Sequence, residues 1–245
     1  MKFSILASGS KGNCSIVESD GVKIMIDCGT TKKYLTQSFN TIDIDVDTVN
    51  AVLITHDHSD HTSQLKLFHH LEVYSPTPLL YEHQLVEAYV PFRIEHITIT
   101  PIQTSHDAGD SVGYIIEDGT SKLVYITDTG YIRDRDLEYL ASADFYIMES
   151  NHDPELLMET SRPYYIKRRI LSDTGHLSNH DAGTILGKVV SDQTKEIVLA
   201  HMSEQANNEQ VALSTVRSFV KDLKIKLSVA KQYEITMGGN QNEKQ

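Results

Sequence analysis

The strongest constraint on the fold of this chain is a run of six residues, His56-Asp57-His58-Ser59-Asp60-His61. The run directly follows an apolar segment, residues 49–55, of the kind that forms a buried strand. A tight loop after a strand can direct residues i and i+2 the same way and the following pair another way. Since imidazole and carboxylate groups are ligands for cations such as zinc, the spacing predicts half-sites for two neighbouring divalent ions.

One cluster cannot close two metal sites, so the remaining ligands should lie elsewhere in the chain. Layered α/β folds tend to carry their sites on loops held by rigid strands. A lone downstream histidine would more often be a surface residue, and a lone aspartate a turn residue, but their order after the cluster favours ligation. The candidates are His106 after the apolar strand 98–103, Asp128 after 123–127 and His201 after 197–200.

Runs of β-type composition alternate with runs of helical periodicity along the chain, with turn residues between them. This order contains both hairpins and crossovers. It predicts an α/β fold of two mixed β-sheets packed face to face with helices outside, a four-layer αββα sandwich. We expect residues 1–245 to form a single domain. Strands are predicted over 2–7, 14–18, 22–27, 49–55, 94–102, 112–117, 122–127, 144–149, 197–200 and 225–235, and helices over 30–39, 63–71, 78–90, 134–141, 164–171, 181–190 and 207–223.

The chain is acidic, with 22 Lys and Arg against 34 Asp and Glu and a formal net charge of −12. This balance is not typical of a general nucleic-acid binder. It is compatible with a nuclease, because several carboxylates would be metal ligands and bound cations reverse the local field. Cys14 and Cys28 are expected to be reduced core residues of a cytoplasmic protein, since no targeting segment or membrane-spanning run is recognised.

At these residues the chain resembles the metallo-β-lactamase superfamily, whose HxHxDH hallmark matches residues 56–61. The resemblance implies two divalent ions per chain, with zinc expected and manganese or iron as alternatives. It also implies that a water or hydroxide bridges the two ions. The implied ligands are His56, His58 and His106 for one ion and Asp60, His61 and His201 for the other, with Asp128 bridging both.

Further segments resemble the YycJ-like (VicX-like) group, which is described as nucleases with exonuclease action on DNA and is distantly similar to ribonuclease Z and ribonuclease J. Asp128 stands where true β-lactamases usually have a cysteine, which argues against lactam hydrolysis. The interval between Glu149 and His176 is too short for the inserted second domain of ribonuclease J. The matching segments are residues 8–13, 149–153, 175–179 and 200–203, with Asn207 and Asn208.

Two adjacent divalent ions suit hydrolysis of a phosphodiester, with the bridging hydroxide as the nucleophile. Asp60 is expected to hold the attacking water and to accept its proton. His176 is the candidate general acid because it follows a glycine just before a helix, much as a histidine does in ribonuclease Z. Glu149 would orient His176 and favour its charged form. Asp57 is a candidate for orienting an imidazole from behind.

The one basic run of the sequence, residues 162–169, lies between Glu149 and His176 and is therefore expected to pass near the site. Its tyrosines would stack on bases and its cations would contact phosphates, although a solvated basic helix face is an equal alternative. In a helix, Tyr165 and Arg169 share a face and Arg168 points elsewhere. The predicted contacts to nucleic acid are Tyr165, Lys167, Arg169 and Asn179.

The leading hypothesis is a metal-dependent phosphodiesterase that acts on nucleic acid, most simply single-stranded DNA from an end. A hydrolase of small esters, cyclic phosphodiesters or thioesters, of the glyoxalase II kind, is an alternative that the net charge of −12 favours modestly. A di-iron reductase scaffold would want a flavin-binding partner domain, for which no room is left. A regulatory metal-binding module would not need His176 or Glu149.

Overall fold

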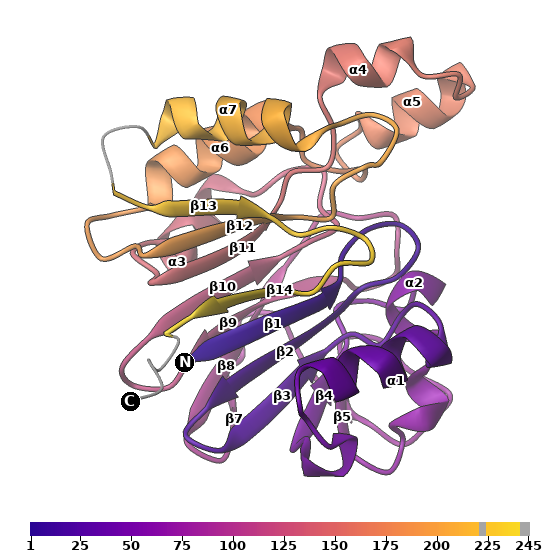
Figure 1. Ribbon diagram of the computed structural model, residues 1–245, viewed down its shortest axis with the longest axis vertical. Helices are drawn as coiled ribbons and strands as arrows, with labels where there is room; N and C mark the ends of the chain where they lie inside the picture. The colour runs from indigo at the N-terminus through magenta and orange to yellow at the C-terminus, as the bar shows by residue number, and fades with distance from the viewer. Residues whose placement is uncertain (221–223, 241–245) are drawn as a thin grey trace.

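Two β-sheets face each other in the middle of the molecule, and helices cover their outer faces (Figure 1). The computed structural model describes residues 1–220 and 224–240, and within these residues each sheet has seven strands. The predicted four-layer αββα sandwich is therefore confirmed. That residues 1–245 form one domain stays a prediction, and residues 221–223 and 241–245 lie outside the described part of the chain.

The first sheet begins as an antiparallel meander and continues as parallel strands. The strands β14, β1, β2 and β3 run antiparallel to their neighbours, whereas β3, β4, β5 and β6 are parallel. In order across the sheet, the strands are β14 (Thr236–Gly239), β1 (Lys2–Ala7), β2 (Cys14–Ser19), β3 (Val22–Ile26), β4 (Ala51–Leu53), β5 (Glu72–Ser75) and β6 (Gln84–Leu85). The helical elements of this half are α1 (Lys32–Thr41), η1 (Val46–Thr48), α2 (Ser59–Thr62) and η2 (Leu65–Leu67).

The second sheet has the same mixed plan. Its strands β7 to β10 are antiparallel and β10 to β13 are parallel. Helices α6 and α7 lie above it, and α4 and α5 form a hairpin at one end of the molecule (Figure 1). In order, the strands are β13 (Lys226–Val229), β12 (Glu196–Ala200), β11 (Phe145–Glu149), β10 (Lys122–Ile126), β9 (Val112–Glu117), β8 (Ile97–Gln103) and β7 (Phe92–Ile94). The helical elements are η3 (Asp134–Asp136), α3 (Leu137–Leu140), α4 (Pro154–Glu159), α5 (Tyr164–Ile170), α6 (Asn179–Val189) and α7 (Glu209–Phe219).

Strand β10 shows why both faces of each sheet are apolar. Its side chains alternate, as the period of two residues in a strand requires. Leu123 and Tyr125 join the core between the two sheets, while Val124 and Ile126 join the core under the helices. A strand covered on both faces therefore reads as a continuous apolar run, which is the pattern that the sequence shows before Asp128.

Two predicted elements are wrong and others have different limits. The segment predicted as a helix over 78–90 contains β6 and turns instead, because Val86 N donates to Ser75 O at 2.9 Å and so extends the sheet. The helix predicted over 63–71 is only the short turn η2. The strand predicted over 94–102 is a hairpin, because Glu95 takes a left-handed φ of 52°.

At the C-terminal end, the strand predicted over 225–235 stops at Val229, and β14 closes the first sheet instead. Of the helix predicted over 207–223, α7 occupies Glu209–Phe219, and residues 221–223 lie outside the described residues. Throughout residues 1–220 and 224–240, each helix is too short or too polar to cross a bilayer.

A buried hydrogen bond joins the two sheets below the loop that carries the histidine cluster. The Tyr114 hydroxyl on β9 donates to the carbonyl oxygen of Ile54 at 2.6 Å, two residues before His56. Removing it leaves a buried carbonyl without this partner, at a cost of about 1–3 kcal/mol. We therefore expect Tyr114→Phe to lower the free energy of unfolding by about that amount in urea denaturation. Tyr139→Phe, a change at an exposed tyrosine, is the matched control, and equal denaturation midpoints for both variants would contradict the assignment.

Candidate metal centre

Candidate ligands, and a buried aspartate that supports one of them, lie where strands of both sheets end. The residue just after β3 is Asp27, β12 leads directly into His201, and Asp128 follows β10 by two residues. All three have left-handed backbones, with φ of 59°, 54° and 55°. This conformation is uncommon for residues other than glycine and is concentrated at functional sites, where the surrounding structure holds it.

Backbone contacts fix the loop of residues 56–61 against the turn after β3. The amide of Cys28 donates to His61 O at 2.7 Å, and the amide of Asn13 donates to Asp60 O at 2.8 Å. Gly29 lies so close to this loop that a Cβ atom there would be 1.8 Å from Asp60 O. Glycine at this position therefore lets the two segments approach each other.

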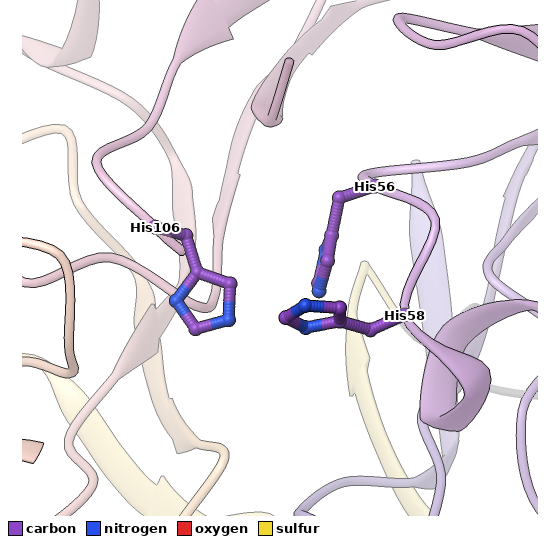
Figure 2. Close-up of side chains that lie close together, drawn as sticks. All are labelled: His56, His58 and His106. Carbon is purple, nitrogen blue, oxygen red and sulfur yellow. The ribbon is translucent and has the colours of Figure 1, made fainter. Parts of the chain in front are cut away.

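Three histidines from two loops face one another (Figure 2). The ring centroid of His56 lies 4.6 Å from that of His58 and 5.0 Å from that of His106. Each ring offers a nitrogen within 4.8 Å of those of the other two. Burial and the neighbouring His61 lower the pKa of His56 to about 2, so its imidazole is neutral and keeps a lone pair for a cation.

A second group contains Asp60, His61 and His201, whose ligand atoms also lie within 4.8 Å of one another. Asp128 stands between the two groups. Its Oδ2 is 3.2 Å from His61 Nε2, and its Oδ1 is 3.4 Å from His201 Nε2 and 3.8 Å from His106 Nε2. The Asp128 carboxylate thus faces ligand atoms of both groups, as a bridging ligand must.

Four of the imidazoles share one orientation. In each of them Nδ1 has a polar partner on the side of the ring away from the centre. These partners leave the Nε2 atoms directed at the centre, and such support fixes the tautomer of a metal-binding histidine. Nδ1 of His56 lies 3.1 Å from Thr55 Oγ1, that of His61 2.8 Å from Asp27 Oδ2, that of His106 3.1 Å from Gly175 O and that of His201 3.2 Å from Glu149 Oε1.

Buried polar atoms without hydrogen bonds test whether the site fits metal ions. Among the described residues, His56 Nε2, His201 Nε2 and Asp128 Oδ2 are buried and have no hydrogen-bond partner. Such atoms are rare in folded proteins, and an ion is one of their standard explanations. The nitrogen and oxygen donors suit zinc, manganese or iron. The residues present therefore fit a pair of divalent cations.

Asp27 is a supporting residue that the sequence analysis missed. Its carboxylate is fully buried, accepts from the amide and hydroxyl of Thr55, and accepts from Nδ1 of His61. Although burial opposes a charge on His61, Asp27 and Asp128 outweigh it and raise the pKa of that imidazole. Asp57, the predicted supporting carboxylate, is exposed. The sequence contained a signal for Asp27, since this aspartate follows a buried apolar strand as Asp128 does.

The structure brings the predicted general acid and its partner together. His176 Nδ1 lies 2.7 Å from Glu149 Oε1, and the His176 ring stacks on His201 with 5.1 Å between centroids. Glu149 is buried and also accepts from the amide of Thr129 at 2.8 Å. Burial alone would raise the pKa of Glu149, but His176 and His201 outweigh it and hold the pKa below its usual value.

The predicted substrate contacts divide into two kinds. Tyr165 and Arg169 lie one turn apart on α5 and are exposed, and Arg169 pairs with Asp107 next to His106. Lys167 is instead buried, because its Nζ donates to Met158 O at 2.7 Å and Thr160 O at 2.8 Å. This ammonium ties α5 to the end of α4, so the prediction that it contacts substrate is corrected.

The prediction for Asn179 is corrected as well. Its side chain is buried and pairs with the side chain of Asn207, with Nδ2 of Asn179 2.9 Å from Oδ1 of Asn207. It also accepts from Ser150 Oγ at 2.6 Å. Asn179 therefore holds the start of α6 against the loop after β11, and it supports His176 indirectly.

Comparison with known proteins identifies the family of the chain. A family model described as a beta-lactamase superfamily domain matches residues 23–202. Exodeoxyribonuclease YycJ of Bacillus anthracis is 34% identical over 237 residues, which cover 91% of this chain and 90% of that protein. Exodeoxyribonuclease WalJ of Streptococcus pneumoniae is 33% identical over 232 residues, which cover 88% of this chain and 86% of that protein.

Solved structures share the fold at low sequence identity. The metallo-β-lactamase fold protein YhfI from Bacillus subtilis has a TM-score of 0.72 at 18% identity, with 97% of this chain and 100% of that chain covered. The short form of human tRNase Z has a TM-score of 0.66 at 16% identity, with coverage of 96% and 98%.

The role of Asp27 can be tested by metal binding alone. We expect Asp27→Asn to weaken the affinity for the more tightly bound divalent ion about 10- to 100-fold, since partners that orient a ligand histidine contribute that much. The measurement is competition with a chromogenic chelator for zinc. Asp57→Asn, which changes an exposed carboxylate in the loop that carries His61, is the control. Equal zinc affinity in the two variants would show that Asp27 does not support a ligand.

Proposed function

This chain belongs to the metallo-β-lactamase superfamily and is a metal-dependent hydrolase; we propose that it is an exonuclease that hydrolyses phosphodiester bonds of single-stranded DNA. The observation that carries the proposal is the Glu149–His176 pair beside the Asp128 carboxylate. When a phosphodiester of DNA is hydrolysed, the bond from phosphorus to one sugar oxygen breaks, and this oxygen leaves as an alkoxide that needs a proton. The names of the two curated relatives, both exodeoxyribonucleases, support DNA as the polymer.

The chain's own residues would hold two cations and move two protons. His56, His58 and His106 would bind one ion, and Asp60, His61 and His201 the other, with Asp128 between them. Two bound divalent ions would supply a nucleophile at neutral pH and neutralise the charge that develops on the phosphate oxygens. Asp60 has a partly exposed carboxylate at the edge of the cluster, where it would accept the proton of the attacking water.

His176 would return a proton to the leaving oxygen. Its Nδ1–H donates to Glu149 Oε1, so the proton available to substrate is on Nε2. The Glu149 carboxylate, held ionised in the interior, stabilises the protonated imidazole that must form before transfer. The His176 side chain is 17% exposed, which gives a substrate access to the ring.

A strand of nucleic acid would leave the centre along α5. Tyr164 and Tyr165 are 67% and 71% exposed, enough for their rings to stack on bases. Arg169 follows Tyr165 by one helical turn, and the carboxylate of Asp107 holds it beside His106. This stretch supplies aromatic faces and a cation near the cluster, although the whole chain carries a net charge of −12.

The function is tested with end-labelled single-stranded DNA and RNA, supplied with zinc and then with manganese, alongside bis-p-nitrophenyl phosphate and a lactoyl thioester. Stepwise shortening of DNA is the expected result. Turnover of the small esters without cleavage of any polymer would instead establish the small-molecule hydrolase.

His176→Ala tests the proton donor. We expect this variant to retain both metal ions and its fold, but to cleave DNA about 10²- to 10⁴-fold more slowly, the usual contribution of a general acid. Bis-p-nitrophenyl phosphate has a leaving group that needs no proton, so its hydrolysis should change much less. A wild-type rate on DNA would remove His176 from the mechanism.

A further inference from the structure

A small pocket with both polar and apolar walls opens beside His176 and His201, and Ile170 and Met202 supply its apolar side chains. Its volume is about 60 Å³, and its walls include Ser10, Asn151, Arg162, His176, His201 and Ser203. A water-sized group needs about 10–15 Å³ measured in this way, so the pocket holds about four to six non-hydrogen atoms. That is the size of a tetrahedral anion, and it is too small for a nucleobase.

The charge of the pocket also suits an anion. Arg162 is partly buried, and its Nε donates to Gln205 Oε1 at 2.9 Å. Its two Nη groups make no hydrogen bond or ion pair with the part of the chain that the structure describes. Among the described residues that line the pocket there is no carboxylate. Glu204, the nearest acidic residue in the sequence to Ser203, is paired with Lys11.

Polar groups in the pocket walls are held in place by the fold. Asn151 Nδ2 donates to His201 O at 2.8 Å, and the amide of Ser203 donates to Asn151 O at 2.8 Å. Asn151 and Ser203 are buried, at 7% and 8% exposure. Planar guanidinium groups bind phosphate oxygens in a bidentate manner. The Ser203 hydroxyl, which accepts from the amide of Ala206, keeps its hydrogen to donate to an anion.

We propose that this pocket binds the terminal phosphate of the DNA strand, a phosphate that is not cleaved, and that Arg162 is the residue that selects it. The inference rests on the proposed nuclease function. Since His176 donates its proton to the leaving oxygen, a pocket with His176 in its wall receives the leaving side of the substrate. A pocket of about 60 Å³ has room for one phosphate and none for a base, so it would hold the strand by its end and favour cleavage from an end rather than within the chain.

The test compares matched single strands that carry a 5′-phosphate, a 3′-phosphate or hydroxyls at both ends. The wild-type enzyme should degrade one of the two phosphorylated strands about 10- to 100-fold faster than the hydroxyl strand, the range for a charge-assisted hydrogen bond. Arg162→Gln should abolish this preference, and Arg162→Lys should keep part of it. Arg168→Gln, at an exposed cation of the same run, is the control and should keep it fully.

Binding to the metal-loaded enzyme gives an independent measurement. With dye-labelled, phosphorothioate-linked strands, Arg162→Gln should weaken binding of the phosphorylated strand about 10- to 100-fold and leave binding of the hydroxyl strand unchanged. The rate on bis-p-nitrophenyl phosphate should also stay unchanged. Cleavage of DNA with no preference for either end phosphate, or an undiminished preference in Arg162→Gln, would overturn the pocket while the nuclease function stands. Failure to cleave any strand would overturn both.

Discussion

The buried Asp128 carboxylate is the group around which the rest of the centre is arranged. Burying a charge is costly unless it is compensated. Here burial would raise the pKa of Asp128, but His201, His61 and His56 outweigh it and hold that pKa well below the usual range. The Nε2 atoms of His56 and His201 have no hydrogen-bond partner among the described residues, so these residues fit cations that would complete the compensation.

The fold delivers these groups through strand ends. Parallel strands in each sheet place Asp27, Asp128, Glu149 and His201 at one edge of the sandwich, and the core between the sheets fixes the distance between the two sets. The left-handed backbones of Asp27, Asp128 and His201 then turn the chain directly after the strands. The α4–α5 hairpin, held together by Lys167, adds Arg162 and Arg169 on different sides of the centre. The positions of the candidate metal ligands, of His176 and of the two arginine side chains therefore depend on a few rigid connections.

The sequence predicted the parts of this account that have strong local signals. The HxHxDH run and the apolar strands before Asp128 and His201 identified the fold and the candidate ligands that the structure brings together. Apart from the Glu149–His176 pair, which was predicted, side-chain partners such as that of His61 depend on packing and could not be read from the sequence. Asp27 was missed because a strand-ending aspartate is common, and Lys167 was misassigned because its helix carbonyl partners are formed only in the folded chain. The helix expected over 78–90 failed because pairing with β5 overrides local periodicity.

Metal content per chain tests the central claim most directly. The protein purified with zinc, freed of loosely bound ions by gel filtration and measured by plasma emission spectrometry, should contain two ions per chain. Asp128→Ala should remain folded by circular dichroism but contain fewer, because it loses the carboxylate that faces both groups. Asp134→Ala, at an aspartate with a side chain 94% exposed, should keep both ions. Two ions per chain in Asp128→Ala, or at most one in the wild-type protein, would contradict a two-metal centre bridged by Asp128.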